Sequence, residues 1–268
     1  MNRVQKVIKC FTALLAHPHR LARVLDDEDN WKARVSQKYG HHSGLSTIDL
    51  PFEETIYPYS FLEGTSMLTD LALLKFLARR YEHCAYLEIG TWRGESVANV
   101  ASVAEECITI SLSEEEMRQA KFSEEFIRNN AIFSREMSNV THIGHDSLTF
   151  DFSSLGKKFD LIFIDGDHSY EAVKSDTQNA FRLLKDESSA IVWHDYGYGP
   201  EAVRWSVLAG ILDGCPKDAQ GSIYHVSNTM CAIYLRGSFE ESYPVSPQLP
   251  DKVFTVNLSA KRWMKKRL

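Results

Sequence analysis

The sequence predicts an α/β fold in which a mostly parallel β-sheet is covered by helices on both faces. From Cys84 onward, short apolar segments alternate with longer segments of helical periodicity, which is the order of elements in such a sheet. The short segments are apolar throughout, as expected of strands buried on both faces. Near the end, residues 223–226 and 230–235 flank Ser227-Asn228-Thr229, which predicts a hairpin that closes the sheet with an antiparallel edge.

Residues 1–40 are expected to form two helices that precede the sheet. The apolar residues of the first recur at helical spacing: Val4, Val7, Ile8, Phe11, Leu14 and Leu15. His17-Pro18-His19 interrupts this pattern, and a second helix is expected to end near Gly40. The two helices are expected to form a lid or docking surface for the main domain. Because the first helix has a basic face, the alternative is a dimerisation or membrane-surface element.

The remaining elements follow from periodicity and turn residues. Thr65 or Ser66 is expected to cap a helix over 67–80, after a turn-rich segment at 43–64. Strands are predicted near 84–89, 107–112, 139–144, 159–165 and 189–194, in addition to the final hairpin. Helices are predicted near 94–105, 114–135, 170–185 and 199–213. The tail after Gly237 ends in a basic segment, either a solvated terminus or a contact for an anionic partner or membrane.

Composition excludes several classes of protein. A net charge of −6 argues against bulk binding of nucleic acid, which usually needs a basic face. The five cysteines are scattered without a C-x-x-C pair, so they are expected to be free thiols in a reducing compartment. No apolar run approaches the ~20 residues of a membrane span. We therefore expect a cytoplasmic protein without stable membrane insertion.

Two motifs organise the chain. The first, AYLEIGTWRGES at residues 85–96, reads as a strand that enters a helix across a glycine turn. Such a turn presents backbone N–H groups and a helix N-terminus to a ligand. The second, FDLIFIDGDHSY at residues 159–170, is a buried strand that delivers Asp165, Asp167 and His168 to one edge of the sheet. The next strand ends at His194-Asp195, and adjacent strands lie about 4.8 Å apart, so these side chains are expected to converge.

These motifs resemble those of class I S-adenosylmethionine-dependent methyltransferases, and among them the methyltransferase domain 24 family. The resemblance covers roughly residues 60–236, in which LEIGTWRGES, HIGHDS, DLIFIDGDHSY and IVWHDYG follow one another in order. It implies a Rossmann-like three-layer sandwich with a seven-stranded sheet and an antiparallel last strand. The implied domains are an N-terminal helical extension or lid at 1–58, the methyltransferase domain at 59–237 and a tail at 238–268. The alternative of a dinucleotide site would normally show G-x-G-x-x-G, which is lacking.

The resemblance also implies where S-adenosylmethionine binds. Gly90 and Gly94 let the backbone approach the cofactor, Glu88 accepts hydrogen bonds from its ammonium end, and Ser96 meets its carboxylate. Family members usually end the second strand with an acid that binds the ribose hydroxyls, but Ser111 stands here, with Glu114 as a substitute from the next turn. The expected cofactor-binding residues are Glu63, Thr65, Glu88, Gly90, Trp92, Gly94, Ser96, Ser111, Asp146, Ser147 and Asp165.

Methyl transfer to a hydroxyl requires removal of its proton, by a base or with the help of a metal. By analogy with metal-dependent relatives, Asp165, His194 and Asp195 are the expected ligands of a divalent ion, and Asp167 or His168 is the base. Because relatives often carry an acid where His194 stands, two alternatives remain open. The site takes magnesium, manganese or another metal such as iron or zinc, or it works without metal and His194 is the base.

The sequence therefore predicts an S-adenosylmethionine-dependent O-methyltransferase. Its expected acceptor is a small polar molecule, a glycosyl unit of a bacterial surface polysaccharide or of a secondary metabolite. Aromatic residues at the same rim (Trp92, Tyr170, Trp193, Tyr196, Tyr198) offer surfaces for stacking. The alternatives are a cofactor-binding regulatory or partner protein without activity, motivated by Ser111, and a metal-dependent hydrolase or oxygenase on the same fold. A homo-oligomer formed through the N-terminal helices is a further expectation.

Overall fold

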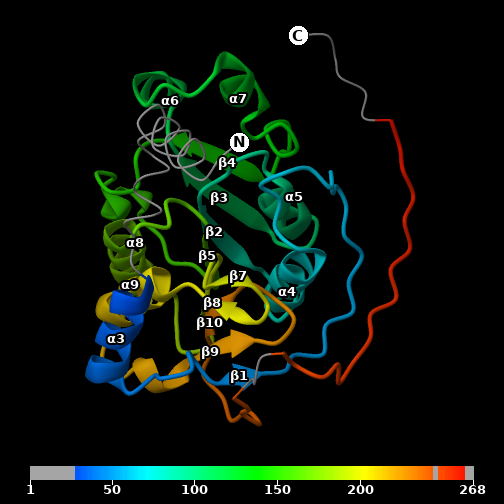
Figure 1. Ribbon diagram of the computed structural model, residues 1–268. Coiled ribbons are helices and arrows are strands. Elements are labelled where there is room, and N and C mark those ends of the chain that lie inside the picture. The colour runs from blue at the N-terminus through cyan, green and yellow to red at the C-terminus, as the bar shows by residue number, and fades with distance from the viewer. Residues whose placement is uncertain (1–27, 244–246, 263–268) are drawn as a thin grey trace, which may run out of the picture.

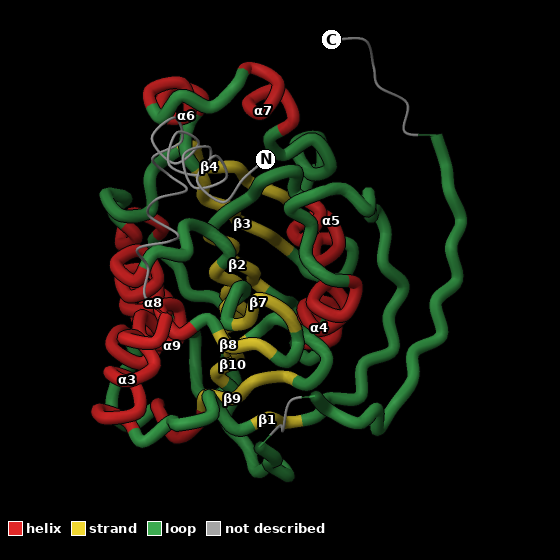
Figure 2. The backbone as a smooth tube through the Cα atoms, in the orientation of Figure 1, coloured by secondary structure: helices red, strands yellow, loops and turns green. Residues whose placement is uncertain are grey.

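The structure, a computed structural model, describes residues 28–243 and 247–262 and confirms the predicted α/β architecture. The described residues form a central eight-stranded sheet that separates two layers of helices (Figure 1). In Figure 2, α3, α8 and α9 lie on one side of the sheet, and α4 and α5 lie on the other. The sheet order is β1-β9-β10-β6-β5-β2-β3-β4, and β7 and β8 form a separate hairpin.

The bounds of the elements agree closely with the predicted alternation. The strands are β1 (Thr47–Ile48), β2 (Ala85–Ile89), β3 (Glu106–Ser111), β4 (Val140–Gly144), β5 (Leu161–Ile164), β6 (Ala190–Trp193), β7 (Gly197–Gly199), β8 (Ala202–Val203), β9 (Ile223–Val226) and β10 (Ala232–Tyr234). The helices are α3 (Glu28–Tyr39), α4 (Leu68–Ala78), α5 (Glu95–Ala101), α6 (Glu114–Gln119), α7 (Glu124–Asn129), α8 (Tyr170–Leu183) and α9 (Trp205–Gly214), with short 3-10 turns at Phe152–Leu155 and Gln220–Ser222.

The antiparallel strand was predicted correctly, but its place in the sheet was not. β10 runs antiparallel to both of its neighbours, β6 and β9, so it lies inside the sheet and not at its edge. The edge strand beyond β9 is β1, which pairs in parallel with it through Thr47 and Ile48. The hairpin therefore inserts its second strand next to β6, and its first strand accepts a further strand from the N-terminal part of the chain. This raises the number of strands from the expected seven to eight.

Three predicted helices differ in detail. The segment 114–135 forms two short helices, α6 and α7, each started by a serine whose hydroxyl accepts a backbone N–H: Ser113 from Glu116 and Ser123 from Phe126. The helix expected from 199 begins only at Trp205, because the β7-β8 hairpin occupies the preceding residues. Helix α4 is capped by Met67 and not by Thr65 or Ser66. Asp70 stabilises this end by accepting the N–H of Met67 at 2.8 Å.

The core lies on both faces of the sheet, as the apolar strands predict. One cluster packs under α8 and α9 and includes Trp193 and Phe159, which are fully buried. The other packs under α4 and α5 and includes Tyr86 and Phe163. Cys84, Cys107, Cys215 and Cys231 are buried free thiols, which confirms that prediction for the described residues. Cys10 lies outside them. No helix in the described ranges is long and apolar enough to cross a membrane.

Helix α3 fixes the N-terminal part of the chain against α9. Asp213, at the end of α9, accepts hydrogen bonds from Arg34 and Lys38 at 2.6 Å each, and also from the hydroxyl of Tyr39. The ring of Trp31 stacks on Tyr170 of α8 with centroids 4.7 Å apart. This part of the second predicted helix is therefore a docked element. The first predicted helix and the last six residues of the basic tail lie outside the described residues.

Candidate active site

The glycine turn after β2 lies directly against the end of β5. Gly90 has a φ of +98°, a conformation that L side chains rarely adopt. A Cβ at this position would overlap the carbonyl group of Asp165. Gly94, with a φ of +78°, begins α5 and packs against Ser134 in the same way. The two glycines therefore allow the turn and the strand end to share one edge of the sheet, as the sequence predicted.

Glu88 is completely buried beneath this turn, with both carboxyl oxygens occupied. The hydroxyl of Tyr86 donates to one oxygen at 2.6 Å, and the hydroxyl of Ser96 donates to the other at 2.8 Å. Burial raises the pKa of Glu88 to about 8, although the two hydroxyl donors act in the opposite direction. Glu88 and Ser96 are thus hydrogen-bonded to each other. Their expected contacts, of Glu88 with the ammonium group of the cofactor and of Ser96 with its carboxylate, stay predictions.

The other expected cofactor residues surround this turn. The indole of Trp92 stacks on Phe126 with centroids 3.9 Å apart, and Gly64 lies next to its Nε1. Arg93 donates to the carbonyl of Glu63 at 2.8 Å. These contacts fasten the exposed loop that carries Glu63 and Thr65 over the turn. The hydroxyl of Thr65 itself donates to the carbonyl of Leu62.

On the opposite side of the turn, Ser111 ends β3 and is half-buried. Its carbonyl accepts the N–H of His145 at 2.7 Å, which brings in the loop that carries Asp146 and Ser147. Asp146 folds this loop by accepting the N–H of Leu148 at 2.9 Å. Glu114, the suggested substitute for the ribose acid, is exposed and pairs with Arg118. The roles of these residues toward a cofactor stay predictions.

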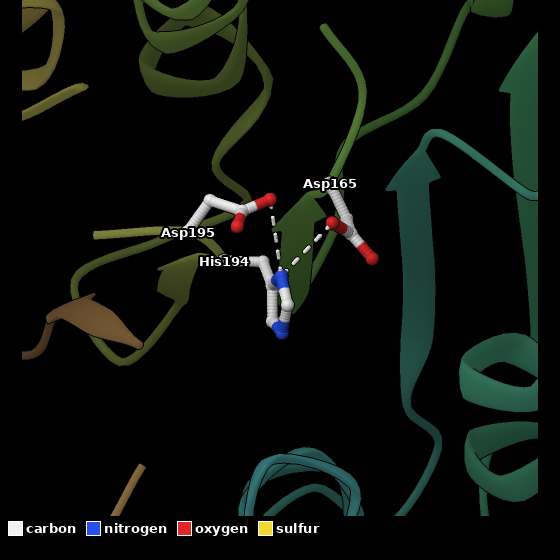
Figure 3. A group of neighbouring side chains, drawn as sticks. All are labelled: Asp165, His194 and Asp195. Carbon is white, nitrogen blue, oxygen red and sulfur yellow. Dashed lines mark ion pairs between the residues drawn. The ribbon is translucent and has the colours of Figure 1, made fainter. Parts of the chain in front are cut away.

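Asp165, His194 and Asp195 converge at the ends of β5 and β6 (Figure 3). His194 Nδ1 lies 3.1 Å from Asp165 Oδ1 and 3.4 Å from Asp195 Oδ2. One ligand atom from each residue lies within 4.8 Å of the other two. Asp195 has a φ of +56°, so its backbone takes a left-handed conformation that is uncommon for a residue with a side chain. That conformation turns its carboxylate back toward His194.

The second ring nitrogen of His194 contacts Asp70, a residue that the sequence analysis missed. His194 Nε2 lies 3.1 Å from Asp70 Oδ2, and Asp70 is completely buried. Asp70 also accepts the N–H of Met230 at 2.9 Å in addition to that of Met67. In the sequence it is an acid in the first turn of an apolar helix, a position that is explained fully by capping. Only the contact with His194 reveals a second role.

His194 and Asp195 stabilise each other's charged forms. Burial acts to lower the pKa of His194, but the surrounding carboxylates of Asp165, Asp195 and Asp70 raise it well above its usual value. The pKa of Asp195 falls to about 2, because His194, His168 and Arg204 outweigh the opposing effect of burial. Despite its two close carboxylates, His194 Nδ1 is buried without a well-aligned hydrogen bond. A buried nitrogen left in this way between two carboxylates fits a site for a divalent ion.

The two candidate bases lie next to the cluster but differ in their surroundings. His168 is half-exposed, and its Nδ1 lies 3.3 Å from Asp195 Oδ2, which leaves Nε2 open. Asp167 is exposed and accepts the N–H of Ser169 at 2.9 Å, a contact that shapes the turn before α8. Arg204, after the β7-β8 hairpin, approaches Asp195 from the other side at 3.3 Å.

Of the aromatic residues expected at the rim, the structure leaves only some accessible. Trp193 and Tyr196 are buried, and Tyr196 accepts the N–H of Leu45 with its hydroxyl. Tyr198 is 57% exposed and lies under the guanidinium of Arg204, 4.4 Å from the ring centroid. Tyr170 is engaged with α3. Trp92 is only partly exposed and is stacked on Phe126, so Tyr198 has the most exposed ring of these five aromatic residues.

Comparisons with known proteins agree with this arrangement. A family model described as a methyltransferase domain matches residues 87–196, a range that begins in the strand before the glycine turn and ends just after His194-Asp195. The chain is also 30% identical over 170 residues to uncharacterized protein R132 of Acanthamoeba polyphaga mimivirus, covering 58% of this chain and 70% of that protein. The chain belongs to the class I S-adenosylmethionine-dependent methyltransferases.

Solved structures similar to this methyltransferase include two putative O-methyltransferases. A caffeoyl-CoA O-methyltransferase from Staphylococcus aureus is 22% identical, with a TM-score of 0.46, over 65% of this chain and 85% of that one. An O-methyltransferase from Klebsiella pneumoniae is 18% identical, with a TM-score of 0.46, over 82% of this chain and 96% of that one.

Proposed function

We propose that this methyltransferase transfers the methyl group of S-adenosylmethionine to a hydroxyl oxygen of a small polar acceptor, with a divalent ion held by Asp165, His194 and Asp195. The observation that carries the proposal is the convergence of the buried His194 Nδ1 with the carboxylates of Asp165, 3.1 Å away, and Asp195, 3.4 Å away, beside the glycine turn. A bound ion would supply Lewis acidity at the acceptor hydroxyl and make it easier to deprotonate.

Asp70 supports this assignment of ligand atoms. Its carboxylate accepts from two backbone N–H groups, so it is an acceptor toward His194 Nε2 as well. A proton on Nε2 leaves Nδ1 as the nitrogen that faces Asp165 and Asp195, and a bound ion would replace the proton that these carboxylates favour on Nδ1. A carboxylate that orients a metal-binding histidine through its second nitrogen is the usual arrangement in protein metal sites. An imidazole among the ligands favours manganese, iron or zinc over magnesium, which prefers oxygen.

In this proposal His168 is the base. Its Nδ1 is oriented by Asp195, and its half-exposed ring leaves Nε2 free to reach an acceptor. Asp167 is less suited because its carboxylate already accepts the N–H of Ser169. As the acceptor oxygen forms its bond to the methyl carbon, the carbon–sulfur bond breaks and the proton passes to His168. The products are the methylated acceptor and S-adenosylhomocysteine.

We further propose a glycosyl acceptor, on the family resemblance and on the exposed ring of Tyr198 near the cluster, which suits stacking on a sugar. We propose that the methyltransferase domain spans residues 59–237. The buried free thiols support a cytoplasmic location. A second candidate is a protein that binds the cofactor without catalysis, which is favoured by Ser111 in place of the ribose acid.

The test combines metal analysis, calorimetry and turnover on the full chain. Purified protein is analysed for bound metal, titrated with S-adenosylhomocysteine, and assayed with manganese on a panel of glycosides and phenols. His194→Ala should lower turnover by about 10³-fold or more while cofactor affinity changes by less than about fivefold, and Asp165→Asn should lower turnover to the same extent. Asp151→Asn and His83→Ala, at exposed positions elsewhere, are matched controls and should behave as the wild type.

Four outcomes would contradict the proposal. Full turnover in both variants would remove the cluster from catalysis, and turnover that is unaffected by chelation would remove the metal. Cofactor binding without turnover on any acceptor would favour the non-catalytic candidate. Tightly bound iron together with oxygen consumption would favour an oxygenase on the same fold.

A further inference from the structure

Asp176, in the second turn of α8, is a buried acid that neither the cofactor turn nor the ligand cluster uses. Its exposed fraction is 0%, and neither of its carboxyl oxygens has a well-aligned hydrogen-bond partner among the described residues. The other buried acids among the described residues have partners: Glu88 accepts from two hydroxyls, Asp160 from the N–H of Ala85 and the ammonium of Lys185, Asp70 from the N–H groups of Met67 and Met230, and Glu95 from the N–H of Ser60. Asp176 therefore differs from them in a way that calls for an explanation.

The position of Asp176 links two loops of the cofactor site. Its Oδ2 would lie 3.9 Å from a Cβ on Gly166, so it lies beneath the loop that follows β5. The side chain of Ser147, in the loop that follows β4, also approaches this carboxyl, without forming a well-aligned hydrogen bond. These loops carry Asp146 and Ser147 on one side and Asp165 on the other, all expected at the cofactor.

The surroundings favour a neutral carboxyl. Burial raises the pKa of Asp176 to about 7, the side chain of Ser147 acts in the opposite direction, and the nearby carboxylates of Asp146 and Asp167 raise it further. The charges that act on it from the two packed loops are thus both negative. An ionised Asp176 would place a third carboxylate beside them, and the repulsion would push the loops apart.

We infer that Asp176 is a positioning residue that, as a neutral carboxylic acid, holds the loops after β4 and β5 in the arrangement that binds the cofactor. A neutral carboxyl offers one O–H donor and a carbonyl acceptor, so it can pair with Ser147 and with the backbone of the Gly166 loop. Ionisation removes the donor and adds the repulsion. The inference rests on the proposed cofactor role of these loops.

The experiment measures the affinity for S-adenosylhomocysteine by calorimetry at about pH 6 and about pH 8.5, on the full chain. If the ionised form does not bind, the affinity of the wild type falls by about tenfold for each pH unit above 7. Asp176→Asn keeps the shape and a neutral donor and acceptor. It should bind as the wild type does at low pH and lose less than about twofold at high pH. Asp176→Ala should bind more weakly at both values, and Asp151→Asn should follow the wild type.

A purely structural role would weaken binding in Asp176→Asn without removing the pH dependence, and that result would overturn the inference. A wild type that binds S-adenosylhomocysteine equally at both pH values would also overturn it. Carbon-13 spectra of the Asp176 carboxyl in the folded wild type give an independent test. The carboxyl should titrate with a pKa near 7, and a pKa near the ordinary value of an aspartate would contradict the inference. Failure of the wild type to bind this ligand at any pH would instead refute the proposed function.

Discussion

The turn after β2 and the paired ends of β5 and β6 meet at one edge of the sheet, but the acidic side chains in the two regions have different surroundings. In the turn, Glu88 is surrounded by donors that belong to the same short segment, Tyr86 and Ser96. At the strand ends, the carboxylates of Asp165 and Asp195 both lie close to His194 Nδ1, which has no well-aligned hydrogen bond. The first region is complete without a ligand. The second is arranged so that a ligand would complete it.

The two regions also use the left-handed backbone conformation for different purposes. Gly90 adopts it where no Cβ fits, because the carbonyl of Asp165 occupies that space. Asp195 adopts it although it carries a side chain, at a cost that a glycine would avoid. Glycine is therefore required at position 90 because a side chain has no room there. At position 195 the carboxylate is kept although it makes the backbone conformation less favourable. Three variants test and sharpen this contrast, in order of decreasing effect.

The largest effect is expected for Gly90→Ala. The added Cβ would meet the Asp165 carbonyl and the positive φ would be strained, so we expect a loss of about 4 kcal/mol in the free energy of unfolding. Gly156→Ala is the matched control, since Gly156 also has a positive φ, of +62°, but has open space around it. It should lose only about 1 kcal/mol from strain. Urea denaturation followed by fluorescence measures both. Equal losses would mean that backbone strain, and not the contact with β5, determines the residue at 90.

An intermediate effect, with the opposite sign, is expected for Glu88→Gln. The folded-state pKa of Glu88, about 8, lies above its ordinary value of 4.5, so the folded protein holds a proton that the unfolded chain releases. The stability that Glu88 contributes is fully present below about pH 4.5 and is lost as the pH rises through about 8. Glutamine should remove this loss and stabilise the protein at pH 8 by on the order of 2–3 kcal/mol.

Unfolding midpoints measured between about pH 5 and pH 8 check this slope. Glu95→Gln, in the same turn, is the control and should leave the slope unchanged. If Glu88 also contacts the ammonium end of the cofactor, the stabilised variant should bind S-adenosylhomocysteine more weakly. A variant with the wild-type slope would show that Glu88 is not the group responsible.

The smallest effect is expected for Asp70→Asn. The amide keeps the size of the side chain but weakens the orientation of His194, so the affinity for manganese should fall by about 10- to 100-fold. Asp160→Asn is the matched control, because Asp160 is equally buried but lies at the start of β5, far along the strand from the cluster. It should lower stability without changing metal affinity. Metal affinity measured by calorimetry separates the two, and a loss in both variants would indicate a general effect of destabilisation.

The order of strands and helices was predictable because each element has its own pattern of apolar residues. The apolar runs that end at Ile89, Ile164 and Trp193 identified the strands, and the parallel connection placed their carboxyl ends at one edge. The glycines at positions 90 and 94 predicted the turn between β2 and α5. The neighbourhood of Asp165, His194 and Asp195 followed from these facts alone, since a strand can only deliver the next residues to its own end.

What the sequence could not determine were contacts made between elements that are distant along the chain. Asp70 lies 124 residues before His194, and its local pattern is fully explained by the cap of α4. The interior position of β10, the added strand β1 and the unpaired carboxyl of Asp176 likewise depend on which segments meet in space. By itself, the sequence determined the fold class, because local periodicity encodes it, and its resemblance to metal-dependent methyltransferases suggested the candidate metal ligands. Only the tertiary structure decided which buried acids have partners, because hydrogen bonding and dielectric environment are properties of the packed neighbours and not of the residue.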